Sequence, residues 1–272
     1  MPAIQLARLK IQCVQLVESA DSPAAFCAKL DQLLDFYADR SRHPARAGEP
    51  PPIIRAYHVP QPVLKQIMNE IKPFTAKHPR AALALCDQLW QTPCLEFRML
   101  SATILGVLPA EYKTEVLNRA HNWMRSESVN LIIEAILDQG LAVIRKEAAQ
   151  DLVNQVESWL NCKERHLQRT GLRALVPMVQ DVDFFNLPVI FRLITPWARA
   201  APEYIRTDLV SVVRVLARRT PAETAFFLQL NLETPENPLT PWLIRQVLDE
   251  FPLELKGKLQ AKIREIEPTK AQ

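Results

Sequence analysis

Apolar residues recur every three or four positions along most of the chain, in segments separated by short polar or proline-containing breaks. This spacing places the apolar side chains of a segment on one face of an α-helix. The segments come in pairs, and in four successive pairs the first segment ends close to a tryptophan: Trp90, Trp123, Trp159 and Trp197. Intervals of 33, 36 and 38 residues separate these tryptophans, as in proteins built from repeated helix pairs.

The paired segments account for most of the chain. The tryptophan-containing segments are AALALCDQLW, KTEVLNRAHNW, AQDLVNQVESW and LPVIFRLITPW, and their partners are CLEFRMLSATILGVL, SVNLIIEAILDQGLAVI, ERHLQRTGLRALVPMV and PEYIRTDLVSVVRVLARR. A fifth pair follows, AETAFFLQLN and PLTPWLIRQVLDEF, and PQPVLKQIMNEIKPF is expected to be the second helix of an earlier pair. We predict an all-α fold, a right-handed α-solenoid of helix pairs, in which the tryptophans pack between repeats rather than bind a ligand.

The N-terminal part differs from the array. IQLARLKIQCVQLVES and SPAAFCAKLDQLLDFYADR predict two helices, and the segment from Arg40 to Tyr57, rich in Pro and Arg, predicts a loop or extended stretch. We expect one compact domain overall, with residues 1–57 packed on an array that spans residues 58–266. Residues 267–272 are expected to form a frayed tail. In such an array the first helices are expected to form the convex layer and the second helices the concave layer.

Composition supports a helical core without deciding the function. Hydrophobic residues make up 48% of the chain, and it has only 5 Gly but 22 Pro, which suits helices punctuated by proline. The formal net charge of +3 is only mildly basic. Any case for nucleic-acid binding therefore rests on how the charges cluster.

Cysteine and histidine usage gives no sign of a metal site. The five cysteines include no CxxC pair, and the five histidines are scattered. We expect reduced thiols in a cytoplasmic protein. The N-terminus does not resemble a secretory signal, no segment is long and apolar enough to span a membrane, and no enzyme signature such as HExxH or GxSxG occurs.

Polar stripes mark the second helices of neighbouring pairs. Arg165, Arg169 and Arg173 recur every four residues, beside His166. In the next pair Arg206, Ser211, Arg214 and Arg218 share one arc with Thr207, and in the preceding pair Asn130, Glu134 and Asp138 hold the equivalent stripe. Any one stripe is more typical of a solvated helix face, whereas two adjacent cationic stripes on one layer are equally consistent with a cradle for a phosphate backbone.

Several segments resemble the AlkD-type DNA alkylation repair proteins, which are built from HEAT-like helix pairs. The similarity lies in HVPQPVLKQIMNEI, in LCDQLWQTPCLEFRMLSATIL with its Leu-Trp and Glu-x-Arg motifs, in HLQRTGLRAL and in EYIRTDLVSVVRVLARRTP. It covers about residues 58–250. The resemblance implies binding of duplex DNA on the concave face and excision of alkylated, positively charged purines, without a cofactor.

The resemblance also implies roles for individual residues. Arg169 matches the family's backbone-positioning arginine, and Glu134 takes the place of its cleft aspartate. The two tryptophans that contact the lesion sugar in the family fall on Asn130 and Ser211, which have no aromatic ring. Glu134 is therefore either a carboxylate that stabilises positive charge growing on the sugar or one that is paired to an arginine such as Arg169.

We accordingly expect a monomer that binds double-stranded DNA on a basic concave face, with slow excision of cationic alkylated purines through Glu134. The expected DNA contacts are Arg165, Arg169, Arg173, Arg206, Arg214, Arg218, His166, Asn130 and Ser211. No metal, cofactor or membrane is expected to take part. The alternative is a non-catalytic HEAT-repeat scaffold for protein–protein interaction, which a dry apolar groove would favour.

Overall fold

The computed structural model describes residues 5–39, 54–234, 237 and 239–266, and the predicted tail 267–272 lies outside them. Every regular element of the described residues is a helix, and the one β feature among them is an isolated bridge between Arg55 and Cys94. The all-α class is therefore confirmed, whereas the right-handed turn of the array stays a prediction. No described helix is both long enough and apolar enough to cross a lipid bilayer.

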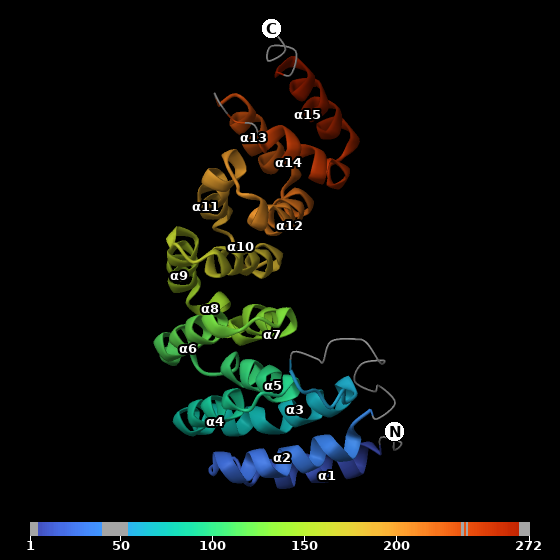
Figure 1. Ribbon diagram of the computed structural model, residues 1–272, viewed down its shortest axis with the longest axis vertical. Helices are drawn as coiled ribbons and strands as arrows, with labels where there is room; N and C mark the ends of the chain where they lie inside the picture. The colour runs from blue at the N-terminus through green and yellow to red at the C-terminus, as the bar shows by residue number, and fades with distance from the viewer. Residues whose placement is uncertain (1–4, 40–53, 235–236, 238, 267–272) are drawn as a thin grey trace. The chain divides into compact units, whose positions relative to one another are not determined.

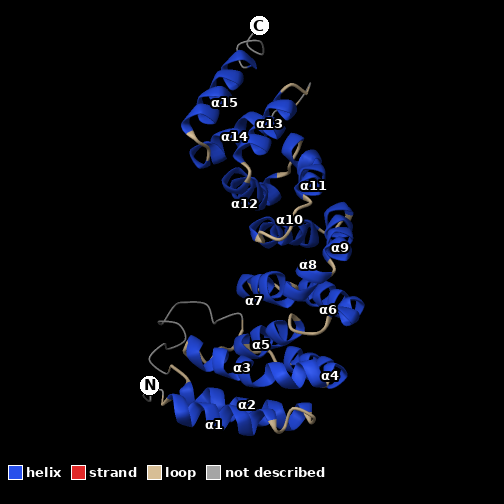
Figure 2. Cartoon of the chain, turned by 180° about the vertical axis from the view of Figure 1, so that it is seen from behind, coloured by secondary structure: helices blue, strands red, loops and turns tan. Residues whose placement is uncertain are grey.

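Two compact units, Met1–Ala148 and Ala149–Gln272, make up the chain (Figures 1 and 2). The first unit contains α1 (Leu6–Val17), α2 (Pro23–Tyr37), α3 (Gln61–Lys77), α4 (Pro79–Gln91), α5 (Leu95–Leu105), η1 (Ala110–Tyr112), α6 (Lys113–Ser126), α7 (Asn130–Ala135), η2 (Ile136–Gly140) and α8 (Ala142–Glu147). The second contains α9 (Ala149–Asn161), α10 (Arg165–Gln180), α11 (Leu187–Arg199), α12 (Glu203–Arg219), α13 (Pro221–Leu232), α14 (Leu239–Val247), η3 (Leu248–Glu250) and α15 (Leu253–Ile266).

Helices of the first unit pack in two rows. The helix α2 packs against α4 in one row, while α1, α3, α5 and α7 follow one another in the other. The two N-terminal helices thus continue the rows of the array, and the expected boundary between residues 57 and 58 falls inside this unit. The segment 60–74, predicted to be the second helix of an earlier pair, forms most of α3, and α3 contacts α5.

The second unit repeats the pairing. The pairs are α9 with α10, α11 with α12, and α13 with α14, and α15 packs on α13. The second helices of these pairs, α10, α12 and α14, lie side by side in sequence order. We call them the second-helix row. The cationic helices predicted from the sequence are therefore neighbours in one row.

The four tryptophans occupy the places that their spacing predicts. Each stands within the last four residues of the first helix of a pair, in α4, α6, α9 and α11. The indoles of Trp90 and Trp123 stack with ring centroids 4.4 Å apart and an interplanar angle of 7°, and Trp159 is 1% exposed. In the first unit the stack joins α4 to α6, which confirms a packing role between successive repeats.

One predicted helix is interrupted. The segment SVNLIIEAILDQGLAVI was expected to be continuous, but it forms α7, a π-helical turn (η2) and α8. The π turn lies against the end of α5 at a close backbone approach: an added Cβ at Gly106 would lie 1.7 Å from the Gln139 carbonyl oxygen. Arg145 donates hydrogen bonds to the Leu137 and Asp138 carbonyl oxygens, at 3.2 and 3.0 Å, which satisfies acceptors that the irregular turn leaves open.

Candidate nucleic-acid interface

The arginines predicted on α10 and α12 belong to two helices that pack along each other in the second unit (Figure 1). We call this set the arginine face; it consists of Arg165, Arg169, Arg173, Arg206, Arg214 and Arg218. Buried apolar residues hold the helices together from the opposite side, among them Leu172 and Leu175 on α10 and Leu209 and Val213 on α12. Burial of these side chains forces the polar arcs of both helices outward.

One arginine of this face is held by a buried carboxylate. Nε of Arg169 donates a hydrogen bond of 2.7 Å to Oδ2 of Asp208 on α12. The Asp208 side chain is 11% exposed, whereas that of Arg169 is 44% exposed. The guanidinium is therefore oriented by one edge while much of it stays open to solvent. Asp208 is not among the site residues predicted from the sequence.

An aromatic ring lies next to Arg165. The guanidinium carbon of Arg165 lies 5.2 Å from the ring centroid of Tyr204, and the Tyr204 hydroxyl is hydrogen-bonded to Gln168 of α10. Arg165 is exposed and is the first residue of α10. The tyrosine fixes the position of a cation whose place at a helix start is otherwise unfavourable.

The C-terminal part of α12 carries partly neutralised charge. Arg218 makes a two-pronged bond with Glu250, with Nε 2.7 Å from Oε2 and Nη2 3.1 Å from Oε1. Nε of Arg214 lies 3.0 Å from Oε1 of the same residue, close enough for an ion pair but without the alignment of a hydrogen bond. The hydrogen bond from Arg218 and the nearby positive charges lower the pKa of Glu250, which keeps that carboxyl ionised. The single negative charge of Glu250 thus offsets half of the positive charge of Arg214 and Arg218.

Arg219 follows Arg218 in the sequence, but its side chain stabilises the fold. Its guanidinium donates to the carbonyl oxygens of Val179 (2.6 Å), Asp181 (2.6 Å), Val182 (3.2 Å) and Phe184 (2.7 Å). These carbonyls lie at and just after the end of α10, where helical acceptors are left without intrahelical donors. Arg219 therefore caps α10 and is not available to a ligand.

Two further residues of the second unit, His166 and Ser211, are predicted DNA contacts. His166 and Ser211 are half-buried, on α10 and α12. The Ser211 hydroxyl donates to the Thr207 carbonyl oxygen at 3.0 Å, so its oxygen can still accept a hydrogen bond. The structure thus brings Ser211 and His166 onto the same pair of helices as the arginine face.

Asn130 and Glu134 lie together on α7, in the first unit, and both are exposed. A buried carboxylate fixes the start of this helix. Oε1 of Glu127 accepts from the backbone N–H groups of Ser128 and Val129, each at 2.8 Å, and Oε2 accepts from Nη1 of Arg98 at 2.6 Å. Since the Glu127 side chain is 2% exposed, this network determines where α7 begins.

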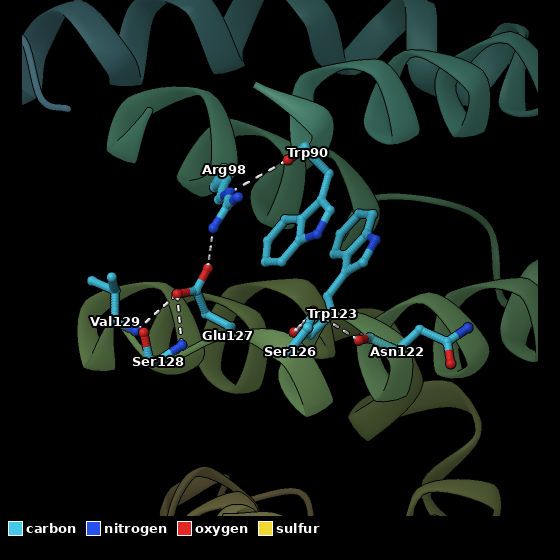
Figure 3. A network of polar contacts seen from close by, with 8 residues as sticks. All are labelled: Trp90, Arg98, Asn122, Trp123, Ser126, Glu127, Ser128 and Val129. Atoms are coloured by element: carbon cyan, nitrogen blue, oxygen red, sulfur yellow. Dashed lines mark hydrogen bonds and ion pairs between the residues drawn. The ribbon is translucent and has the colours of Figure 1, made fainter. Parts of the chain in front are cut away.

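Figure 3 shows that the same network reaches the tryptophan stack. Nε of Arg98 donates to the Trp90 carbonyl oxygen at 3.3 Å, and its guanidinium carbon lies 5.1 Å from the Trp90 ring centroid. Arg98 therefore connects the end of α4 to the carboxylate that fixes the start of α7. The role of Arg98 at the candidate site is to hold α7 in position.

The Glu-x-Arg motif that contributed to the resemblance is explained by these contacts. Arg98 is its arginine. Its glutamate, Glu96, is 3% exposed and accepts a 2.7 Å hydrogen bond from the backbone N–H of His58, which has a positive φ of 53°. A left-handed conformation is unusual for histidine, and a buried carboxylate partner offsets its cost. The motif thus fixes the chain path before α3 and after α6.

No three His, Cys, Asp or Glu residues within the described ranges cluster closely enough to hold a metal ion. The described cysteines are all free thiols, and three of them, Cys13, Cys86 and Cys94, are buried. The second unit thus offers cations and aromatic rings, and α7 of the first unit carries the exposed carboxylate of Glu134.

The family model described as "DNA alkylation repair enzyme" matches residues 53–248 of this chain. The chain belongs to this DNA alkylation repair family. The matched region runs from just before α3 through α14, so it includes the arginine face and α7. Comparisons with curated proteins and with solved structures gave no match. Membership of the family supports a function related to DNA repair.

Proposed function

We propose that this protein binds duplex DNA through the arginine face. The observation that carries the proposal is the side-by-side packing of α10 and α12, which gathers six arginines on two neighbouring helices in a member of a DNA alkylation repair family. Guanidinium groups bind phosphate oxygens through two parallel hydrogen bonds, so a row of them suits a phosphate backbone.

This proposal also accounts for the cations at the start of α10. A positive charge in the first turn of a helix costs a few tenths of a kcal/mol against the helix dipole. The same helix end presents backbone N–H groups that attract an anion. Phosphate binding therefore offsets the cost, since Arg165 and the helix start favour the same ligand.

We further propose that Glu134 supports excision of cationic alkylated purines. Alkylation gives the base a positive charge, so it departs as a neutral leaving group when the glycosidic C1′–N bond breaks and takes the bonding electrons with it. Positive charge then develops on the sugar, where a carboxylate is stabilising. Water adds to C1′, and Glu134 accepts the proton that this water loses.

Excision is expected to be slow. The positions that carry sugar-contacting tryptophans in the resembling proteins are Asn130 and Ser211 in this chain. Glutamate also has one more rotatable bond than aspartate, and a misplacement of about 1 Å can cost roughly 100-fold in rate. The rate should therefore be limited by positioning rather than by the leaving group.

One observation supports the alternative function, a non-catalytic scaffold for protein–protein interaction. An apolar groove of about 810 Å³ lies between α11 and α13, and it is lined mainly by Phe185, Phe191, Phe226, Phe227 and Leu230. Phe185 is 83% exposed and Phe226 66% exposed. This groove lies between first helices rather than on the second-helix row, so it does not compete with the arginine face for a ligand.

Release of methylated purines from methylated duplex DNA, with DNA binding measured in parallel, tests both halves of the proposal. We expect slow release by the natural protein and none by Glu134→Gln, which should bind DNA as well as before or slightly better. Asp138→Asn is the matched control, because Asp138 is an exposed carboxylate on the adjoining π turn. Release that persists in Glu134→Gln would place the chemistry elsewhere, and binding without any release would favour the non-catalytic relative.

A further inference from the structure

A small cleft opens beside the arginine face in the second unit. It has a volume of about 240 Å³ and lies at the end of α11 and the starts of α12 and α14. Six residues line it: Arg199, Ala200, Ala201, Arg206, Leu239 and Trp242. The volume is below the range of about 300–1,000 Å³ that is usual for drug-sized ligands. Arg206 belongs both to this cleft and to the arginine face, so the two surfaces are continuous.

Two guanidinium groups are held at this cleft by one edge each. Nε of Arg206 donates to the Ala201 carbonyl oxygen at 3.1 Å, and Nε of Arg199 donates to Oδ1 of Asn231 at 2.9 Å. Within the described part of the chain, the terminal nitrogens of these two arginines have no hydrogen-bond acceptor. Both guanidinium groups are therefore oriented before a ligand binds. Their terminal nitrogens, two on each arginine, can donate hydrogen bonds to it.

The cleft also has a flat apolar wall. Trp242 is half-buried, and the guanidinium carbon of Arg206 lies 5.7 Å from its ring centroid. Leu239, one turn earlier on α14, is buried. An indole with an arginine beside it provides stacking together with positive charge, the combination with which proteins bind single-stranded nucleic acids.

A buried polar network keeps these walls in place. Nδ2 of Asn237 donates to the Asn231 carbonyl oxygen and to the Thr240 hydroxyl, both at 2.7 Å. The Thr240 hydroxyl in turn donates to the Ala198 carbonyl oxygen at 3.0 Å. Asn231, Asn237 and Thr240 are at most 5% exposed. These hydrogen bonds connect the start of α14, which carries Trp242, to the end of α11, which carries Arg199, and to the end of α13.

We propose that this cleft binds one unpaired nucleotide of a DNA strand. Its base lies against Trp242 and Leu239, and its phosphate is bound by Arg199 and Arg206. A base pair is too large for the cleft, so only an unpaired base can enter it. The inference rests on the proposed DNA binding, and it adds a preference for DNA whose end or gap leaves a base without a partner.

Binding of labelled DNA to the full chain tests this inference, with a blunt duplex and the same duplex extended by a short single-stranded overhang. The natural protein should bind the overhang DNA about tenfold more tightly, as expected for stacking of one base. Trp242→Leu should lose this preference and leave blunt-duplex affinity unchanged, while Trp242→Phe should retain most of it. Arg199→Gln should also weaken only the overhang complex, and Arg264→Gln, at an exposed arginine of α15, should change neither.

The outcomes separate this inference from the proposed function. Overhang binding that is unaffected by Trp242→Leu, or an equal loss on both DNAs, would overturn the cleft proposal. Failure of the natural protein to bind the overhang DNA would overturn it as well. Tight, Trp242-dependent overhang binding without any blunt-duplex binding would support the cleft and contradict duplex recognition by the arginine face.

Discussion

Arg169 of α10 and Asp208 of α12 form an ion pair in which Nε and Oδ2 are 2.7 Å apart, and the carboxylate is the more buried partner. The pair joins the two helices of the arginine face. It also means that one of the six arginines has its charge balanced within the protein. Asp208 therefore both stabilises the face and limits its attraction for phosphate.

Asp208→Asn should separate these two effects. The amide keeps an acceptor for Arg169 but removes the charge, so we expect a loss of about 1–2 kcal/mol in the free energy of unfolding. The loss is moderate because the Arg169 side chain is 44% exposed. DNA affinity should rise by up to roughly eightfold near 0.1 M salt, since one more arginine charge is available to release a counterion.

Chemical denaturation and duplex binding measure the two quantities. Glu250→Gln is the control for charge, because Glu250 also balances arginines of this face. It should likewise raise affinity. A lower affinity in both variants would show that these carboxylates position the arginines for DNA rather than compete with it.

Gly106 should tolerate no side chain. A Cβ at this position would lie 1.7 Å from the Gln139 carbonyl oxygen, which belongs to the backbone of the π turn and cannot rotate away. Gly106→Ala should therefore cost about 3 kcal/mol in the free energy of unfolding. Gly257→Ala is the matched control, since nothing lies within 4 Å of its Cβ position in α15.

The control substitution should stabilise the protein by about 0.5–1 kcal/mol, because alanine is the better helix former. Urea unfolding followed by circular dichroism measures both changes. Equal effects of the two substitutions would contradict the close approach of α5 to the π turn.

Local pattern was enough to predict the helix pairs, because the 3.6-residue period of apolar positions needs no knowledge of the neighbouring helix. The tryptophan spacing located the repeats for the same reason. The π turn lies against Gly106, at least 30 residues before it, and no periodicity reveals such an approach. The burial of Asp208 likewise depends on α10, since in the sequence it is only one acid on a polar arc.

The sequence was sufficient to predict which helix faces form the candidate site. The arc of α12 placed Arg214 and Arg218 outward, but their shared partner Glu250 comes from η3, at the end of the next repeat. Arg219 follows them directly and caps α10 instead. Which arginines remain available to a ligand is therefore decided by tertiary contacts that the sequence does not display.

Thiol reactivity should distinguish Cys162 from the other cysteines. Burial raises the pKa of Cys27 to about 11 and that of Cys13 and Cys94 to about 12, and raises the pKa of Cys86 further still. Only a thiolate reacts readily with iodoacetamide. At pH 8 we expect Cys162, which is half-buried, to be labelled first and the other four to be labelled slowly.

Mass spectrometry of the labelled peptides gives the order of reaction. Because the folded pKa values are raised, these thiols favour the folded state fully below the ordinary value of about 9. That contribution should disappear as the pH rises from about 9 toward 12. Rapid labelling of Cys86 in the folded protein at pH 8 would contradict its burial between α4 and α5.

The salt dependence of duplex binding tests the central claim most directly. Five engaged cations would give a slope of about −4 to −5 in log K against log salt. Asp208 and Glu250 each offset part of the positive charge of this face, so we predict a slope of about −3 to −4. Arg165→Gln should make the slope shallower by about one, and Arg192→Gln, on α11 and paired with Glu157, should leave it unchanged. A slope near zero, or no binding at low salt, would contradict DNA recognition by the arginine face.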